Sequence, residues 1–189
     1  MGQIVLASGS PRRLRLLEEG GFSVHVVPSN APELEDSGMQ PGDLAVENAR
    51  RKWMAVSPQH GGQVVVAADT VVWLGGKFYG KPRDMRDAER MLGELSGRTH
   101  IVATGVAFGL GGSEPEVFFE ETRVAFRELD PEEIRAYLAS IHPLDKAGGY
   151  AAQDGGERII ASIKGSMSNV VGLPMEALGT ALAKFFPGA

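Results

Sequence analysis

The 189-residue chain has no cysteine, no long apolar run and no excess of positive charge. The lack of cysteine excludes disulfide bonds, thiolate catalysis and cysteine-based zinc sites. No apolar stretch reaches the roughly 18 residues of a membrane-spanning helix, so we expect no membrane partner. A net charge of −5 without a dominant basic patch argues against duplex nucleic acid as a partner. No signal or transit pattern is present, and we therefore expect a cytoplasmic protein.

The composition is that of a globular protein with a buried core, with 43% hydrophobic and 23% charged residues. The length suits one domain over residues 1–189, built as two lobes that share a core. Hydrophobic patterning predicts both strands and helices. Strands are expected at 4–7, 22–27, 64–74, 77–80, 100–110, 116–127 and 158–163, and helices at 11–20, 43–56, 85–96, 131–140 and from 175 onward.

The segment 6–13 reads Leu-Ala-Ser-Gly-Ser-Pro-Arg-Arg and leads from a short strand into a helix. Ser10 fits the N-cap position, where its hydroxyl can accept from the first turn, and Pro11 fits the first helical position. The unpaired N–H groups at such a helix start bind anions readily.

Two arginines stand in the first turn of this helix, where positive charge opposes the helix dipole. Arg12 and Arg13 are explained if a strongly negative group docks between them. Together with Ser8 and Ser10 they suit a diphosphate or triphosphate. The alternative is an ordinary capped helix with two solvated arginines.

Asp69 and Thr70 interrupt the most apolar segment of the chain, residues 64–74. A carboxylate within a buried strand is costly unless it is paired, hydrogen-bonded or bound to a metal. Asp69 is therefore a candidate functional residue. The alternative is an aspartate that ends the strand at a bend or caps a neighbouring loop.

Two lysines, Lys52 and Lys81, are candidates whose positions are also compatible with ordinary solvated side chains. Lys52 lies on or beside the buried stripe of the helix predicted at 43–56, where most lysines extend outward along the apolar surface. Lys81 stands on a connector before the helix that Asp84 caps, a place where lysines are usually solvated.

Two further polar segments are candidates for binding. The loop 28–42 contains three acidic residues, Glu33, Glu35 and Asp36, and loops of this length usually have a function or are mobile. Gln153 follows the paired glycines 148–149, and its amide suits the edge of a base; the alternative is a glycine-rich turn with a solvated glutamine. Residues 165–169 are predicted to form a polar turn, and His100 is interpreted as a strand-end residue.

Seven segments in order along the chain together resemble the Maf family of nucleoside triphosphate pyrophosphatases. They are 6–13, 67–72 (Ala-Ala-Asp-Thr-Val-Val), 80–84 (Gly-Lys-Pro-Arg-Asp), 95–100, 104–106 (Thr-Gly-Val), 145–153 (Asp-Lys-Ala-Gly-Gly-Tyr-Ala-Ala-Gln) and 165–174. The resemblance implies an α/β fold similar to that of inosine triphosphatase-type enzymes. A long mixed sheet would be flanked by helices, with two lobes around a central cleft, and the protein would form a homodimer.

The resemblance also implies a reaction. A nucleoside triphosphate would be split into a monophosphate and pyrophosphate with a divalent cation, Mg²⁺ or Mn²⁺. The segments 150–153 and 165–171 look like the branch that acts on dTTP and UTP. One alternative is a pyrophosphatase for methylated or deaminated purine nucleotides such as 7-methyl-GTP. Another is a nucleotide-binding regulator of septum formation.

The family pattern further implies roles for individual residues. Ser8, Arg12, Arg13, Lys52 and Lys81 would surround the phosphates.

Two acidic side chains, Glu33 and Asp69, would hold the cation, and Asp69 would also take a proton from the attacking water. Glu35 and Asp36 are alternatives to Glu33 in the same loop.

Base selection would fall to Arg12, Thr70 and Gln153. These assignments give a function to each of the candidates that the residues alone leave open.

Overall fold

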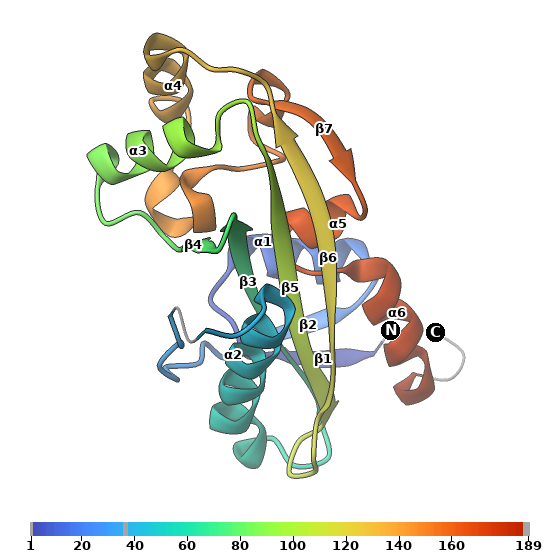
Figure 1. Cartoon of the computed structure of the whole chain (residues 1–189). Helices are drawn as coiled ribbons and strands as arrows, with labels where there is room; N and C mark the ends of the chain where they lie inside the picture. The colour runs from blue at the N-terminus through green and yellow to red at the C-terminus, as the bar shows by residue number, and fades with distance from the viewer. Residues whose placement is uncertain (1, 36–37, 187–189) are drawn as a thin grey trace.

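One mixed sheet runs through the computed structural model, which describes residues 2–35 and 38–186 (Figure 1). Its seven strands follow the order β2-β1-β3-β5-β6-β7, with β4 paired to β3. β1 is parallel to β2 and β3, and the other pairs are antiparallel. The strands are β1 Gln3–Leu6, β2 Ser23–Val26, β3 Val64–Leu74, β4 Lys77–Tyr79, β5 Thr99–Leu110, β6 Glu116–Phe126 and β7 Ile160–Lys164. The predicted α/β fold with a mixed sheet is confirmed.

Helices lie on both faces of this sheet. They are α1 Pro11–Glu19, α2 Pro41–Val56, α3 Met85–Leu95, α4 Pro131–Leu138, α5 Met167–Val171 and α6 Met175–Leu182. Asp84 caps α3 by accepting from a backbone N–H, and Asp130 forms a capping box with Glu133 at α4. None of the helices formed by residues 2–35 and 38–186 combines the length and the apolar character that a bilayer span requires.

Several predicted elements differ from those in the structure. A helix, α5, replaces the polar turn expected at 165–169, because the Ser166 hydroxyl accepts from the Asn169 N–H and caps it. β7 begins at Ile160 rather than 158, because a left-handed Gly155 and a short 3-10 turn precede it. α2 begins at Pro41, two residues early, since proline fits the first helical position.

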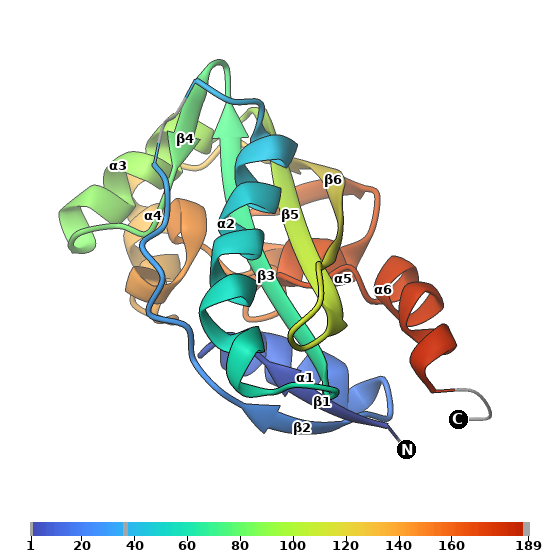
Figure 2. The same ribbon diagram turned by 90° about the horizontal axis from the view of Figure 1, so that it is seen from below.

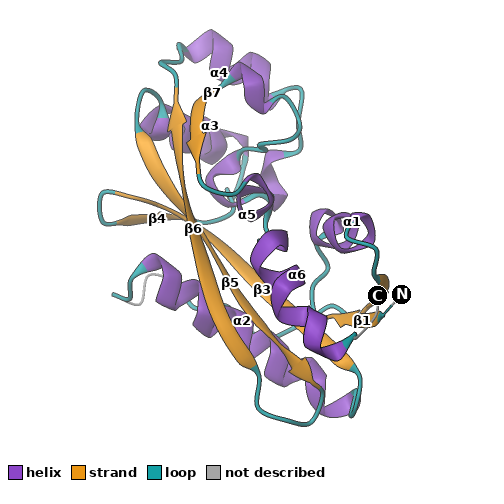
Figure 3. Ribbon diagram, turned by 90° about the vertical axis from the view of Figure 1, so that its right-hand side faces the viewer, coloured by secondary structure: helices purple, strands orange, loops and turns teal. Residues whose placement is uncertain are grey.

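The residues of β3 alternate between the two faces of the sheet. Val65 and Ala67 pack with α2 on one face, which Figure 2 shows lying across β3 and β5. Val64 and Val66 pack on the other face with side chains of α1 and α6, which Figure 3 shows on the side opposite α2. The same alternation directs Asp69 toward α2 and Thr70 toward α1.

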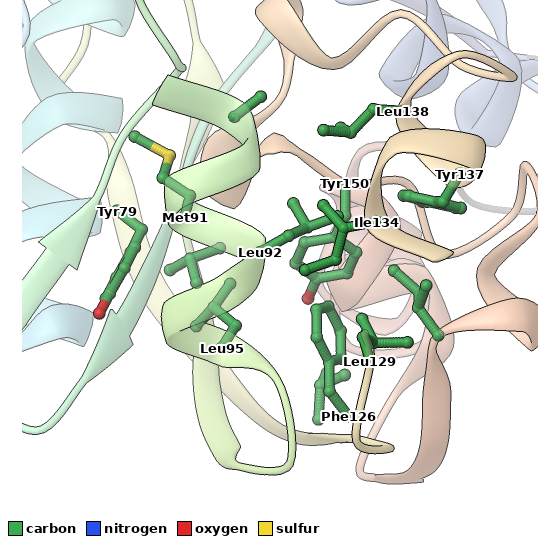
Figure 4. Close-up of a cluster of buried hydrophobic side chains, with 14 of the residues drawn as sticks. Tyr79, Met91, Leu92, Leu95, Phe126, Leu129, Ile134, Tyr137, Leu138 and Tyr150 are labelled. Atoms are coloured by element: carbon green, nitrogen blue, oxygen red, sulfur yellow. The ribbon is translucent and has the colours of Figure 1, made fainter. Parts of the chain in front are cut away.

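A third apolar cluster joins α3 and α4 to the far end of the sheet (Figure 4). Its members include Tyr79, Met91, Leu92, Leu95, Phe126, Leu129, Ile134, Tyr137, Leu138 and Tyr150. This cluster is distinct from the two clusters in which side chains of α1 and of α2 pack against the sheet. The expected division of a single domain into two lobes stays a prediction.

One edge of β3 has a gap between its two partners. β1 pairs with Val64–Val66 and β4 pairs with Val72–Leu74. Among the described residues, no strand lies beside positions 67–71 on this edge. Side chains from both faces of β3 can therefore reach one common space.

Candidate active site

A cavity of about 900 Å³ lies at this gap in the sheet. All nine residues predicted for the site line it: Ser8, Arg12, Arg13, Glu33, Lys52, Asp69, Thr70, Lys81 and Gln153. They come from segments far apart in the sequence, which the sheet brings to one place. Their individual roles stay predictions.

Asp69 lies on the α2 side of the cavity as half of a buried ion pair. The Lys52 ammonium donates to Asp69 Oδ1 at 2.6 Å and contacts Glu33 Oε1 at 2.7 Å. β3 continues through Asp69 as predicted, so the alternative of a strand-ending bend is wrong. Lys52 is buried and turned inward, unlike most lysines at such positions.

Glu33 stands at the mouth of the cavity with 44% of its side chain exposed. Partial burial raises the pKa of Glu33. The hydrogen bond and the charge of Lys52, with smaller contributions from the charges of Lys81 and Arg13, together lower it by more than burial raises it. The net pKa of Glu33 lies below its ordinary value, which favours the carboxylate. Glu35 also lines the cavity, and Asp36 lies outside the described residues.

Arg13 is buried on the opposite face of β3, where three of its hydrogen bonds join separate segments. It donates to the Gly172 carbonyl at 2.8 Å, to Ser8 Oγ at 3.0 Å and to Thr70 Oγ1 at 3.0 Å. Burial lowers the pKa of Arg13, while the charge of Asp69 opposes this effect. The alternative of a solvated arginine is therefore wrong for Arg13.

Arg12 reaches across the cavity to Asp145. Their side chains form an ion pair at 3.0 Å, and Arg12 also donates to the Asp145 carbonyl at 3.4 Å. Burial raises the pKa of Asp145, but Lys146 and Arg12 together lower it below the ordinary value. Arg12 is thus already paired with a carboxylate at the edge of the site.

Ser10 occupies the predicted N-cap position, but its side chain caps no N–H group among the described residues. Its backbone N–H instead donates to Ser8 Oγ at 3.2 Å. The predicted capping bond was wrong because the turn directs Ser8, not Ser10, toward the helix start. Ser8 in turn accepts from Arg13, and these contacts hold the turn against the cavity.

Lys81 and Gln153 are exposed residues at the wall of the same cavity. Lys81 follows β4, which ends at the far side of the gap in β3. Gln153 follows Tyr150 and Ala151, which belong to the buried core. The sheet and this core therefore fix the backbone on which both side chains stand.

His100 lies close to a strand end, as predicted, but it is 1% exposed. Its Nε2 lies 2.8 Å from the hydroxyl of Tyr150, a residue that lines the cavity. Burial lowers the pKa of His100 to about 4, so the ring is neutral at pH 7.

Asn48 and Lys146 also line the cavity and were not among the predicted site residues. Asn48 donates to Asp69 Oδ2 at 3.0 Å, and Lys146 donates to Asp145 and to the His142 carbonyl. Asn48 precedes Lys52 by one helical turn and therefore lies on the same face of α2. The position of Lys52 on the buried stripe could thus have indicated that Asn48 is buried as well.

Two carboxylates at the cavity are of the ligand type that a hard divalent cation prefers. Carboxylate oxygens of Glu33 and Asp69 lie within 2.7 Å of one nitrogen, that of Lys52. Groups of three or more potential metal ligands are absent from residues 2–35 and 38–186. A cation held by these two carboxylates would complete its coordination with water or phosphate oxygens, as Mg²⁺ commonly does.

Comparison with known proteins identifies similar chains. The family described as "Maf-like protein" matches residues 3–185. A protein of Akkermansia muciniphila named dTTP/UTP pyrophosphatase is 44% identical over 174 residues, 91% of this chain and 90% of that protein. A protein of Bacillus cytotoxicus with the same name is 41% identical over 189 residues, 100% of this chain and 98% of that protein.

A solved structure has the same fold with little sequence similarity. The Ham1 protein of Staphylococcus aureus superposes with a TM-score of 0.53 at 14% identity, covering 97% of this chain and 99% of that protein. At this identity the similarity concerns the fold alone.

Proposed function

The chain belongs to the Maf family, and from this premise we propose that it is a nucleoside triphosphate pyrophosphatase acting on dTTP and UTP. The reaction would cleave the bond between the α and β phosphates and release the monophosphate and pyrophosphate. The names of the relatives from A. muciniphila and B. cytotoxicus support this substrate choice.

The observation that carries the proposal is the buried Asp69 carboxylate in a cavity that is also lined by four basic residues, Arg12, Arg13, Lys52 and Lys81. In the proposed mechanism Asp69 accepts a proton from the water that attacks the phosphorus. Lys52 holds this carboxylate in place through its 2.6 Å contact.

The phosphate chain requires several positive groups, because its negative charge is redistributed as the bond breaks. We assign this role to Arg12, Arg13, Lys52 and Lys81, with Ser8 as a further hydrogen-bonding group. Their common place at the cavity supports the assignment. Arg13 would act from a fixed position, because its contacts with Gly172 and Thr70 hold its guanidinium in place.

A divalent cation, Mg²⁺ or Mn²⁺, would bind to Glu33 and Asp69. When bound, it would neutralise phosphate charge and help to orient the attacking water. The lowered pKa of Glu33 supports the assignment, because a cation ligand must be deprotonated.

Base selection is assigned to Arg12, Thr70 and Gln153. The Gln153 amide both donates and accepts, which matches the alternating oxygen and N–H groups at the edge of thymine or uracil. The exposure of Gln153 at the cavity wall leaves it accessible to a base.

Pyrophosphate release from the purified protein with Mg²⁺ or Mn²⁺ tests the proposal. The panel is dTTP, UTP, CTP, ITP and 7-methyl-GTP. Release mainly from dTTP and UTP is expected, and release mainly from a purine nucleotide would contradict the proposed specificity. No release from any of them would contradict the enzymatic function itself.

A homodimer in the cytoplasm is the proposed state of the protein, on the basis of the family resemblance and the sequence. Sedimentation of the purified protein and cell fractionation test these two statements.

A further inference from the structure

Asn48 is a buried polar residue on the face of α2 that packs against the sheet, with an exposed fraction of 2%. Its Oδ1 accepts from the Leu34 N–H at 2.7 Å. Its Nδ2 donates to the Leu34 carbonyl at 3.1 Å and to Asp69 Oδ2 at 3.0 Å. Both donors and the acceptor of the amide are therefore used by groups on two other segments.

The two bonds to Leu34 hold a segment that has no helix or strand of its own. Leu34 lies in the loop between β2 and α2, directly after Glu33. Because the backbone N–H and C=O of Leu34 both bind the Asn48 amide, the backbone of Leu34 is fixed in position and in orientation. The neighbouring Glu33 is thereby placed where its carboxylate reaches Lys52 at 2.7 Å.

The third bond fixes the plane of the Asp69 carboxylate. Lys52 binds Oδ1 and Asn48 binds Oδ2, so each oxygen of Asp69 has its own donor. A single donor would leave the carboxylate able to rotate about the bond to its β-carbon. With two donors on one helix, the orientation of Asp69 follows the position of α2.

We propose that Asn48 is a positioning residue that joins the loop carrying Glu33 to Asp69 and so sets the relative placement of the two carboxylates. The catalytic consequence rests on the proposed function. The positional statement rests only on the hydrogen bonds of Asn48 with Leu34 and Asp69.

Two variants of Asn48 separate its contacts. Asn48→Asp keeps an oxygen that accepts from the Leu34 N–H, but it removes both donors and places a second carboxylate beside Asp69. Asn48→Leu has a similar volume and removes all three bonds. Glu47→Gln is the matched control, because Glu47 is the preceding residue of α2 and its ion pair with Arg51 lies outside the cavity lining.

Amide hydrogen exchange of the metal-free protein, followed by NMR, is the readout that does not require activity. In Asn48→Leu we expect the Leu34 amide to exchange roughly tenfold faster or more, with amides of β3 unchanged. In Asn48→Asp we expect Leu34 to stay closer to the wild-type rate, because its acceptor is retained. Unchanged Leu34 exchange in Asn48→Leu would overturn the proposal, and faster exchange throughout the protein would reduce Asn48 to a general structural role.

Kinetics with dTTP provide the second readout. Both variants lose the donor to Asp69, so we expect kcat to fall roughly tenfold or more. The KM for dTTP should change much less, while the metal concentration for half-maximal rate should rise. Glu47→Gln should match the wild type, and wild-type kcat in both Asn48 variants would overturn the catalytic part.

The two proposals fail in different ways. A wild-type protein that hydrolyses none of the triphosphates contradicts the proposed function. The amide exchange of Leu34 then still tests whether Asn48 holds the loop, independently of any activity. An active wild type with active Asn48 variants contradicts only the role of Asn48.

Discussion

Asp69 and Gly105 lie directly opposite each other in the pairing of β3 with β5. A β-carbon added at Gly105 would overlap the backbone of α2 at Ala45 and Val46. The glycine thus permits α2 to approach the sheet closely beside Asp69. From this position Lys52 and Asn48 reach the two oxygens of the carboxylate.

Gly105→Ala should lower the free energy of unfolding by about 3 kcal/mol, because the overlap is with backbone and cannot be relieved by a rotamer change. Activity should fall as well, since α2 would be displaced from Asp69. Urea unfolding measures the first effect. Gly93→Ala is the control: Gly93 lies in α3, a β-carbon there meets nothing within 4 Å, and the substitution should be neutral or stabilising.

Asp69→Asn keeps the shape of the side chain and removes its ability to accept a proton from water. We expect kcat for dTTP to fall by roughly 100-fold or more. Steady-state pyrophosphate release measures the effect, with Asp43→Asn in the first turn of α2 as a control away from the cavity. Near-normal turnover would rule out Asp69 as the base.

Arg13→Ala removes a buried guanidinium that holds the cavity wall together. KM should rise and kcat should fall, because phosphate binding and the placement of Thr70 are both lost. The Gly172 carbonyl would also lose its 2.8 Å hydrogen bond from Arg13, so the melting temperature should drop. Arg15→Ala, an exposed residue of the same helix, should change neither property. Unaltered kinetics in Arg13→Ala would show that the phosphate site is elsewhere.

Gln153→Ala should change the preference among bases while leaving part of the activity. The phosphate-binding groups are untouched, so the loss should depend on the base of the substrate. The measurement is the ratio of kcat/KM values across the five triphosphates, compared with Gln59→Ala, which lies outside the cavity lining. An identical substrate profile would argue against base reading by Gln153.

His100 should make the folded state less stable in acid. Its pKa is about 4 in the folded protein and about 6.5 when unfolded, so the unfolded chain binds the proton more readily. The contribution of the neutral His100 to the free energy of unfolding is therefore fully present above pH 6.5. It is lost as the pH falls toward 4, and the loss is about 3 kcal/mol at most. Urea unfolding between pH 4 and 7 should show a flatter profile for His100→Gln. An equal slope in both proteins would exclude His100 as the source.

The sequence predicted the elements whose signals are local. The bounds of β3 follow from its largely apolar run, and the starts of α3 and α4 follow from Asp84 and Asp130, whose capping bonds involve neighbouring residues. The α5 helix was missed because a five-residue helix has too short a pattern to separate it from a turn.

The contacts within the cavity depend on segments distant in sequence and were harder to predict. The Ser10 cap was wrong because Arg13, which Thr70 and Gly172 hold from distant segments, donates to the Ser8 hydroxyl, and Ser8 in turn accepts from the Ser10 N–H. Asn48 was missed because its partners, Leu34 and Asp69, lie on other elements.

The hydrogen bond from Arg13 to Gly172 joins residues 159 positions apart. During synthesis, the first residues of the cavity leave the ribosome long before this carbonyl exists. The amino-terminal strand and helix can fold earlier, but Arg13 lacks that acceptor until almost the entire chain has been translated. Nascent chains truncated before Gly172 should therefore be unable to complete the cavity, however well their sheet has formed.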